Sequence, residues 1–442
     1  MEVKKILQQA EKDNIKFITL QFTDLLGVIK EIIIPVEQLE DASRNGVWFD
    51  GSSVEGFARI QESDLFLKPD MATYAVVPWL TEDGITARLI CDIHRSDGKP
   101  FQGDPRFILK QAAAEAQQQG FEYNVGPEPE FYLFRTDCEK RTSPIDYGGY
   151  FDLSSHEGYK AIKKIISALE NFGIKVEASH HEVGLGQYEI DFHYGPCLDI
   201  ADKVVTLKYT AKKIAQIYNL HATFMPKPVM EMAGSGLHTH QSLFDIKTKK
   251  NAFYKETDKY NLSELAYNFI AGQIKHINAM CAILCPTVNS YKRLVSGFEA
   301  PVYVTWAAMN RSALLRVPKW FKAKQEAARI ELRCPDPACN PYLAFAVMLK
   351  AGLDGIKNNL TPPDAVEENI YTLDDESRVK KNIAVLPTSL WESLDELKKD
   401  KLIQDVLGEH LFERYIDVKT KEWNEFKKQV TNWEIETYLD TF

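Results

Sequence analysis

The sequence is poor in cysteine, has no excess of basic residues and contains no long apolar run, and each shortage excludes a class of protein. Its seven cysteines, an odd number scattered over 442 residues, do not form the pattern of a disulfide framework. The pairs Cys281/Cys285 and Cys334/Cys339 are too isolated to predict a four-ligand zinc site, so we expect thiols in the core or in loops. A net charge of −10 argues against a general binder of nucleic acids or membrane surfaces, which needs a basic face.

Membrane spans, export signals and two common nucleotide-binding motifs are also missing. The most apolar stretch, 262–286, contains Glu264, Lys275 and His276, so it predicts a buried helix rather than a membrane span. The first residues lack the apolar run and the cleavage site of a signal peptide, and the cytoplasm is the default expectation. No G-x-x-x-x-G-K-S/T loop appears and no G-x-G-x-x-G follows a strand, so any nucleotide must be bound by another kind of fold.

The order of the secondary-structure signals predicts an α+β protein with two domains. Strands rich in β-branched residues are expected at 16–22, 28–34 and 85–93, before a polar linker that contains two glycines and two prolines. Asp104 and Pro105 then form an N-cap and first-turn pair that opens a helix. Further helices are expected at 156–172, 200–219, 262–284, 342–357 and within 390–442. We therefore predict a small N-terminal domain at 1–103 and a large domain at 104–442.

The stretch NVGPEPEFYLF, residues 124–134, combines the apolar residues of a buried strand with two acids. Alternate residues of a strand point to the same side, so Glu128 and Glu130 should face one way. Two carboxylates at that spacing repel each other unless a positive group lies between them. Taken alone, such a pair is more often a solvated strand face than a binding site.

Other segments place acids, histidines and arginines in the same alternating pattern. They contain Glu182, Glu189, Asp191, His238, His240, Arg329, Glu331 and Arg333. Each could be a structural ion pair or a hydrogen-bonded loop residue, but together the carboxylates and a histidine suit Mg²⁺ or Mn²⁺. Nearby arginines suit phosphate and carboxylate groups. Enzymes that transfer phosphoryl groups typically combine metal ions with such arginines. The residues by themselves leave a metal-dependent phosphohydrolase open as an alternative.

Ten sequence blocks, in order along some 300 residues, resemble the type I glutamine synthetases, and specifically their shorter Bacillus-like alpha branch. The blocks are FDGSS, ESD, GPEPEF, HHEV, GQYEID, KPVMEMAGSGLHTHQS, NSYKRLV, EAP, NRSALLRVP and RIELR. The resemblance implies a β-grasp-like N-terminal domain and a catalytic domain with an antiparallel open-barrel active site. It also implies the reaction, in which glutamate, ammonia and ATP give glutamine, ADP and phosphate.

The resemblance further implies two or more Mg²⁺ or Mn²⁺ ions in each active site. One ion would be bound by the positions that match Glu130, Glu182 and Glu189. The other would be bound by those that match Glu128, His238 and Glu331. Two neighbouring acids of one strand would then serve different ions, which removes their repulsion.

The family's remaining roles transfer to single positions of this sequence. Arg311, Arg316 and Arg333 match residues that stabilise the transferring phosphoryl group, and Arg333 also borders the glutamate site. Arg293 would bind the α-carboxylate of glutamate, and the Gly234 backbone would seat its amino-acid end. The positions expected to contact ATP are Glu177, His240, Ser242 and Arg329.

The resemblance implies that two acids handle ammonia. Asp50 would bind and deprotonate ammonium, and Glu299, on a flap, would close over the intermediate. In the family Asp50 reaches the site of the neighbouring subunit, so the resemblance implies a dodecamer of two stacked hexameric rings.

The sequence departs from the family pattern at a few positions near these sites. Ala233, Ser296 and Phe298 stand where Asn, Pro and Tyr are usual, which affects one substrate-loop hydrogen bond and the flap. Arg59 matches a position tied to glutamine feedback, and Tyr371 aligns with a tyrosine that enteric enzymes adenylylate; we expect Tyr371 to be an unmodified surface residue.

Two related functions are weighed against glutamine synthesis. A γ-glutamyl ligase for another amine would share the metal and ATP sites but would tend to lose the ammonium pocket, which Asp50 and Glu299 retain. A non-catalytic relative should have lost a metal ligand or a phosphate-binding arginine, and none is lost.

Overall fold

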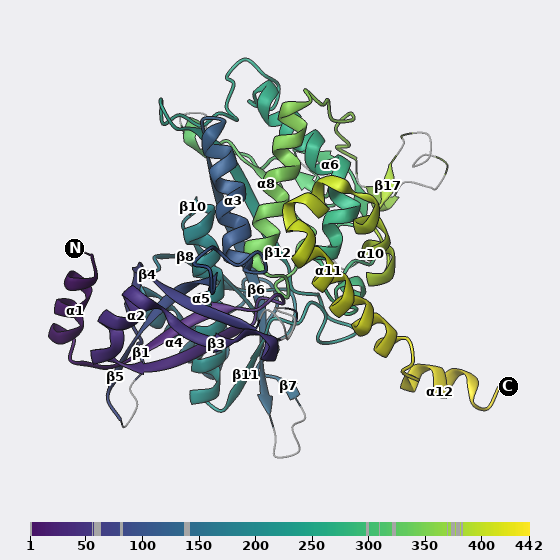
Figure 1. Ribbon diagram of the computed structural model, residues 1–442. Helices are drawn as coiled ribbons and strands as arrows, with labels where there is room; N and C mark the ends of the chain where they lie inside the picture. The colour runs from purple at the N-terminus through teal and green to yellow at the C-terminus, as the bar shows by residue number, and fades with distance from the viewer. Residues whose placement is uncertain are drawn as a thin grey trace.

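The computed structural model describes residues 2–54, 56, 63–79, 83–136, 142–297, 300–308, 310–320, 324–368, 370–372, 376, 381 and 383–442. Figure 1 shows a small N-terminal domain beside a larger helix-covered domain, with the C-terminal helix extending away from the body.

The N-terminal domain is a five-stranded sheet with two helices. Its elements are α1 (Glu2–Lys12), β1 (Ile15–Thr23), β2 (Ile29–Pro35), η1 (Val36–Gln38), α2 (Leu39–Asn45), β3 (Val47–Asp50), η2 (Gly51–Ser53), β4 (Asp64–Val76) and β5 (Ile85–Arg95). The strand order is β2-β1-β5-β4-β3, in which only β1 and β5 are parallel. The domain has a core of its own, with Ile18, Leu20, Leu67, Leu89 and Ile93 fully buried.

A ten-stranded sheet forms the centre of the large domain. Its main path is β14 (Trp306–Ala307), β15 (Leu315–Arg316), β16 (Ile330–Leu332), β12 (Leu237–Asp245), β6 (Phe121–Thr136), β9 (Gln187–Phe192) and β8 (Val176–His181). Three short strands, β7 (Thr142–Pro144), β10 (Gly195–Pro196) and β11 (Leu220–Thr223), also pair with β6. Apart from the parallel pair β14 and β15, the pairings are antiparallel, as predicted for an open-barrel site.

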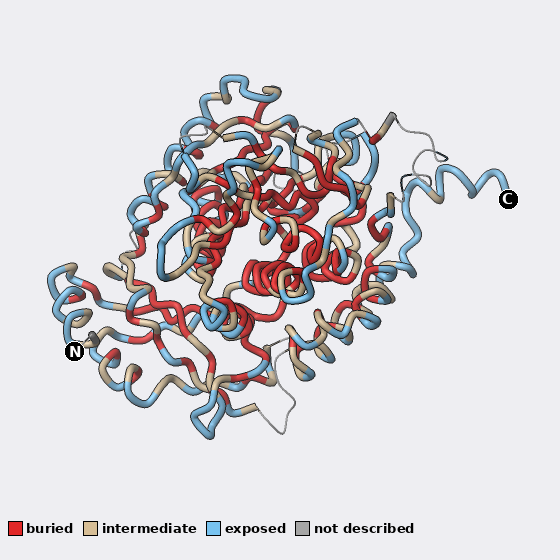
Figure 2. Tube along the Cα trace, turned by 90° about the horizontal axis from the view of Figure 1, so that it is seen from above, coloured by how far each residue is buried: buried red, intermediate tan, exposed pale blue. Residues whose placement is uncertain are grey.

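The large domain also contains helices, most of which pack on this sheet or on one another. They are α3 (Pro105–Gln118), α4 (His156–Asn171), α5 (Cys197–Ile217), α6 (Glu264–Leu284), α7 (Ser290–Arg293), α8 (Pro341–Lys357), α10 (Leu390–Lys399), α11 (Lys401–Phe426) and α12 (Asn432–Tyr438). Two 3-10 turns, η4 (Gln325–Ala327) and η5 (Ile370–Thr372), and the strand pair β13 (Tyr303–Val304) and β17 (Ala384–Val385) complete the large domain. In Figure 2 buried residues gather in the middle of this domain, whereas α12 has no buried residue.

Several local predictions are confirmed. The Asp104 side chain accepts a hydrogen bond from the Arg106 N–H and caps α3, which begins at Pro105. The helices expected at 156–172, 262–284 and 342–357 lie within two residues of α4, α6 and α8. The apolar stretch 262–286 is a buried helix, and no helix among the described residues combines the length and apolarity that a membrane crossing requires.

A buried arginine joins the two domains. Arg106, in the first turn of α3, forms ion pairs with Asp202 of α5 and with Asp70 and Asp92 of the N-terminal sheet, at 2.9, 2.9 and 2.6 Å. Three carboxylates outweigh the cost of burying one guanidinium, so the pKa of Arg106 lies above its usual value even though burial acts to lower it. This contact fixes the N-terminal sheet against the large domain.

Candidate active site

Strand β6 carries the two acids of the GPEPEF segment through the middle of the large sheet. Antiparallel pairing sets Glu128 opposite His238 of β12 and Glu130 opposite Glu189 of β9. The next pairing sets His240 opposite Glu331 of β16. Because opposed residues of neighbouring strands lie about 4.5–5.5 Å apart, the register alone brings these side chains to one surface.

These residues line one cavity of about 370 Å³. Its walls contain Glu128, Glu130, Tyr150, Glu182, Val183, Gln187, Glu189, Ala233, Gly234, His238, Arg293, Arg311, Arg316, Glu331 and Arg333. All six acids and histidines that the sequence analysis assigned to metals are among them. The structure therefore brings together side chains from segments more than 200 residues apart.

One of the two predicted ligand sets converges as expected. The ligand atoms of Glu128, His238 and Glu331 all lie within 4.8 Å of one another. Two carboxylates and an imidazole form a donor set that suits Mg²⁺ or Mn²⁺.

The second set differs in one member from the prediction. Glu182 and Glu189 converge within 4.8 Å of each other, but the third group there is His180, whose Nε2 atom lies 2.9 Å from Glu182 Oε1. Glu130 lines the same cavity, where its Oε2 atom accepts hydrogen bonds of 2.9 Å from Gln187 Nε2 and from the Gly236 N–H. The structure thus adds a histidine that the sequence analysis did not select.

The two ligand sets have opposite electrostatic character. Burial, followed by repulsion from Glu182, raises the pKa of Glu130, and burial, followed by repulsion from Asp191, raises that of Glu189. Burial also acts on Glu128, but His240 and His238 outweigh it and lower its pKa. A divalent cation beside Glu130 and Glu189 would offset their repulsion, so the uncompensated negative charge itself fits a metal site.

Arginines form the positive wall of the cavity. Arg316 Nη1 donates to Glu331 Oε2 at 2.6 Å, and Arg333 Nη1 donates to the other oxygen of the same carboxylate. The Arg333 charge keeps the pKa of Glu331 below its usual value although burial opposes this. Glu331 is fully buried between the two guanidinium groups. Arg311 also lines the cavity, from a more exposed position.

Arg293 lies at the end of α7 and is held by backbone carbonyls. Its Nη1 atom donates to the Cys334 carbonyl at 2.7 Å, and its Nη2 atom donates to the Arg333 carbonyl at 3.1 Å. The loop before β12 passes close to it. A Cβ atom at Gly234 would lie only 2.6 Å from Arg293 Cγ and 2.7 Å from the Pro226 carbonyl oxygen, so only glycine fits there.

A second cavity, of about 520 Å³, adjoins the first. Among its lining residues are Glu177, His240, Ser242 and Arg329, the four positions assigned to ATP. Glu128 lines both cavities, and its Oε1 atom lies 2.7 Å from His240 Nε2. A ligand in the second cavity would therefore reach the acids and arginines of the first.

The remaining assigned residues lie outside these two cavities or outside the described chain. Asp50 is the exposed last residue of β3, where Oδ1 accepts hydrogen bonds from the Ser52 N–H at 2.9 Å and the Ser52 hydroxyl at 2.6 Å. It lines neither cavity of its own chain. Arg59, Phe298 and Glu299 lie outside the described residues.

Two of the departures from the family pattern, and Tyr371, lie among the described residues. The Ala233 carbonyl accepts a hydrogen bond of 2.6 Å from Tyr132 Oη, and Ser296 is exposed. Tyr371 is partly buried rather than a free surface residue, and its hydroxyl donates to the Ala300 carbonyl at 2.5 Å.

Three residues at the site were missed from the sequence. His180 is the first residue of the HHEV block, two positions before Glu182, and could have been noticed there. Tyr150 and Gln187 gave no local signal. Tyr150 hydrogen-bonds Arg311, while Gln187 donates to Glu130 and to the Gly234 carbonyl at 3.1 Å.

Comparisons with known proteins agree with this geometry. Residues 14–96 match the family model "Glutamine synthetase, beta-Grasp domain" and residues 102–438 match "Glutamine synthetase, catalytic domain". Glutamine synthetases of Clostridium saccharobutylicum and Methanosarcina mazei are 48% and 49% identical to this chain, over 99% and 98% of it and 98% and 97% of their own lengths. A solved structure titled "GmaS/ADP complex-Conformation 1" superimposes with a TM-score of 0.88 at 32% identity, covering 98% of this chain and 99% of that one. The chain belongs to the glutamine synthetase family.

Proposed function

We propose that this protein joins ammonia to the γ-carboxylate of L-glutamate at the expense of ATP, giving L-glutamine, ADP and phosphate. The reaction is a ligase step of nitrogen assimilation. We place the protein in the cytoplasm, where these substrates are found. The observation that carries the proposal is the shared wall of the two cavities. A nucleotide in the larger cavity would present its terminal phosphate to the acids, histidines and arginines of the smaller one.

Glutamate is positioned by Arg293 and by the backbone beside Gly234. A carboxylate is a poor acylating agent, so its γ-carboxylate must first become an acyl phosphate. Arg311, Arg316 and Arg333 stabilise the negative charge that spreads over the transferring phosphoryl group. Glu331 keeps the last two in place, because each donates to one of its oxygens.

Two or more Mg²⁺ or Mn²⁺ ions complete the site. Glu128, His238 and Glu331 would hold one ion, and Glu130, Glu182 and Glu189 another, with His180 close to the second set. When bound, these ions neutralise the charge of the phosphates and of the carboxylates.

Ammonium has no free electron pair until it loses a proton. Asp50 accepts this proton, and Glu299 closes the site so that water does not hydrolyse the acyl phosphate. We assign Asp50 to the active site of a neighbouring subunit, in a dodecamer of two stacked hexamers. The exposed position of Asp50, away from both cavities of its own chain, supports this assignment.

The function is tested by measuring which substrates phosphate release requires. Phosphate should appear together with glutamine only when ATP, glutamate and ammonium are all present, and methylamine or polyamines should not replace ammonium. Phosphate release without glutamate would indicate a phosphohydrolase instead, and preference for an amine would indicate another γ-glutamyl ligase.

Arg293 provides a residue-specific test. Arg293→Ala should raise the KM for glutamate far more than the KM for ATP, because a bidentate contact with a carboxylate is lost. Steady-state kinetics with each substrate varied in turn would measure both constants. Equal changes in the two constants would reject the assigned role.

A further inference from the structure

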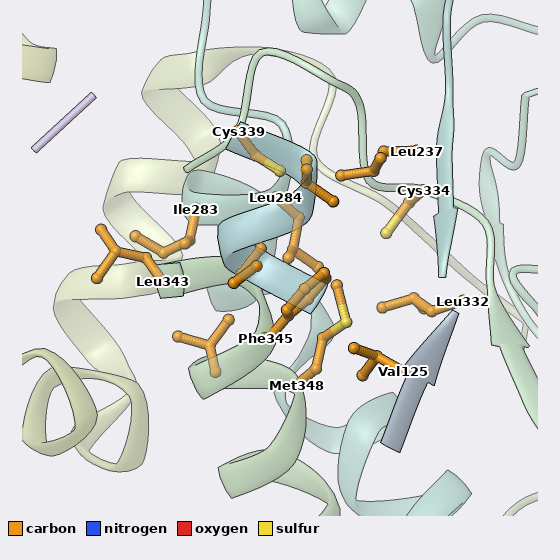
Figure 3. Packing of buried hydrophobic residues seen from close by; sticks show 14 of the residues in the cluster. Val125, Leu237, Ile283, Leu284, Leu332, Cys334, Cys339, Leu343, Phe345 and Met348 are labelled. Carbon is orange, nitrogen blue, oxygen red and sulfur yellow. The ribbon is translucent and has the colours of Figure 1, made fainter. Parts of the chain in front are cut away.

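Three cysteines that are distant in the sequence meet behind the glutamate-binding arginine. Cys281 lies in the last turn of α6, Cys285 is the C-cap of that helix, and Cys334 follows β16. Their sulfur atoms all lie within 4.8 Å of one another, and the three side chains are fully buried. Figure 3 shows the apolar core in which Cys334 and Cys339 lie. The expectation of core thiols is confirmed, but the two sequence pairs are not separate, because Cys334 lies beside Cys281 and Cys285.

We propose that Cys281, Cys285 and Cys334 form a binding site for a thiophilic divalent cation such as Zn²⁺ or Cd²⁺. A metal–sulfur distance of about 2.3 Å sets the sulfur atoms of a tetrahedral complex about 3.8 Å apart. The cluster therefore needs to contract by at most about 1 Å. Thiolates select soft cations over Mg²⁺ and Mn²⁺, so this site differs in chemistry from the carboxylate sites of the active centre.

The charges around the cluster suit such an ion. Binding converts three thiols into thiolates and releases three protons, so ion and ligands together carry one negative charge. Burial raises the pKa of Cys334 well above the usual thiol value, but the positive charge of Arg293 acts in the opposite direction and would balance the complex. Asp336 acts electrostatically on Cys281 and Cys285, but its carboxylate is not a member of the three-sulfur group. This residue is fully buried and its Oδ2 atom makes no well-aligned hydrogen bond, although the Ser290 hydroxyl lies near it.

The cluster is connected to Arg293 through one carbonyl group. The Cys285 thiol donates to the Cys334 carbonyl at 3.2 Å, and Arg293 Nη1 donates to the same oxygen at 2.7 Å. A bound cation removes the thiol proton and draws Cys334 toward α6. Arg293 then loses one of the backbone acceptors that orient it, the shortest of them, so an occupied cluster weakens glutamate binding. This consequence, unlike the cation site itself, rests on the proposed function of Arg293.

The test uses the full-length protein produced in medium supplemented with Cd²⁺. After dialysis against a chelator, which strips the carboxylate sites, elemental analysis counts the cadmium, and ultraviolet absorption detects cadmium–thiolate charge transfer. Wild type and the control Cys91→Ala, which changes a buried thiol of the N-terminal domain, should each retain one ion per chain. Cys285→Ala should retain none, and Cys334→Ala provides a second variant if the first does not fold.

Cadmium in wild type that does not exceed the level in the cysteine variants would overturn the site. Glutamate affinity is then compared between cadmium-loaded and cadmium-free wild type, with magnesium restored. We expect weakening of about 5- to 150-fold, the usual range for coupled sites, and the same factor for the effect of glutamate on cadmium affinity. An unchanged glutamate affinity would overturn the connection to Arg293. Counting cadmium does not depend on turnover, so a failure of the proposed function leaves that result intact.

Discussion

At the scale of single residues, Glu331 combines the two kinds of chemistry found in the active site. Its carboxylate belongs to one ligand set and accepts a hydrogen bond from an arginine at each oxygen. It is fully buried, so neither function can be replaced by solvent. Residues of this kind are sensitive to substitution because a buried charge that loses its partner remains desolvated.

Glu331→Ala should lower the rate of glutamate-dependent phosphate release by about 100-fold or more, since even indirect contacts of a metal site are worth 10–100-fold. It should also lower the free energy of unfolding by about 3 kcal/mol, because Arg316 and Arg333 lose their carboxylate. Stopped assays of phosphate and thermal unfolding measure the two effects. Glu331→Gln, which keeps the shape, is the control, and near-normal turnover of Glu331→Ala would contradict the metal assignment.

At the scale of secondary-structure elements, the turn between β8 and β9 depends on a carboxylate from another segment. Asp146 Oδ1 lies 2.9 Å from His181 Nε2 and accepts a hydrogen bond of 2.9 Å from the Gly186 N–H, while Oδ2 accepts one of 2.6 Å from Tyr188 Oη. His181 Nδ1 in turn lies 2.6 Å from the Glu182 carbonyl. Asp146 thus holds the backbone that presents Glu182 to the cavity.

Asp146→Asn should weaken activation by Mg²⁺ about 10–100-fold while the fold is kept, because the amide cannot accept all these hydrogen bonds and Glu182 becomes less well positioned. Titration of activity with Mg²⁺ measures the effect. Tyr188→Phe removes only one of the contacts and should have a smaller effect. An Asp146→Asn enzyme with normal dependence on Mg²⁺ would show that the turn is held by other contacts.

The junction of α6, α8 and α11 is linked through a histidine. His276 of α6 lies 2.6 Å from Asp400, the N-cap of α11, and 3.1 Å from Asp354 of α8, which also pairs with Lys275. Burial acts to lower the pKa of His276, but hydrogen bonds to the two aspartates outweigh it and the pKa is raised.

A raised histidine pKa means that the folded state binds the proton more tightly than the unfolded state. Its contribution to stability is complete below pH 6.5, the usual pKa of histidine, and is lost as the pH rises through the higher folded-state pKa. Wild type should therefore lose more stability than His276→Asn as the pH rises above 6.5, as measured by denaturant unfolding. Parallel curves for the two proteins would contradict this linkage.

At the scale of the whole molecule, the residue proposed to handle ammonium lies apart from the cavities that hold the other proposed site residues. The proposed ammonium residue, Asp50, belongs to the N-terminal domain and lines neither cavity. Arg106 forms ion pairs with both domains. The position of the N-terminal domain, and of Asp50 on it, is therefore fixed relative to the large domain.

Asp50→Ala should lower the rate of glutamine formation by about 10²–10⁴-fold, the usual effect of removing a positioned base. The deficit should shrink as the pH rises, because free ammonia needs no base. Mixing Asp50→Ala with Glu331→Ala should restore part of the activity if neighbouring chains share sites. Assembly of both variants must be checked by size-exclusion chromatography, and mixed rings without recovered activity would contradict a shared site.

Local sequence was sufficient for three strands of the N-terminal domain, for the main helices of the large domain and for much of the proposed site. Alternation in GPEPEF predicted that Glu128 and Glu130 share a side, and both line one cavity. Alternation in RIELR predicted an apolar side, and Ile330 and Leu332 are fully buried. These features follow from the period of two in a strand, which any short stretch of sequence carries. The order of the motifs also predicted the family, which the comparisons confirm.

Contacts between distant segments were decided only by the tertiary structure. His180 joins Glu182 and Glu189 because β8 pairs with β9, and the sulfur of Cys334 meets α6 because β16 ends beside that helix. Arg106 binds carboxylates of both domains for the same reason. Strand register and helix packing depend on the whole buried core, and no local period encodes which distant side chain becomes the neighbour. The sequence thus determined the strands, the helices and the family, whereas the packing decided which residues complete each site.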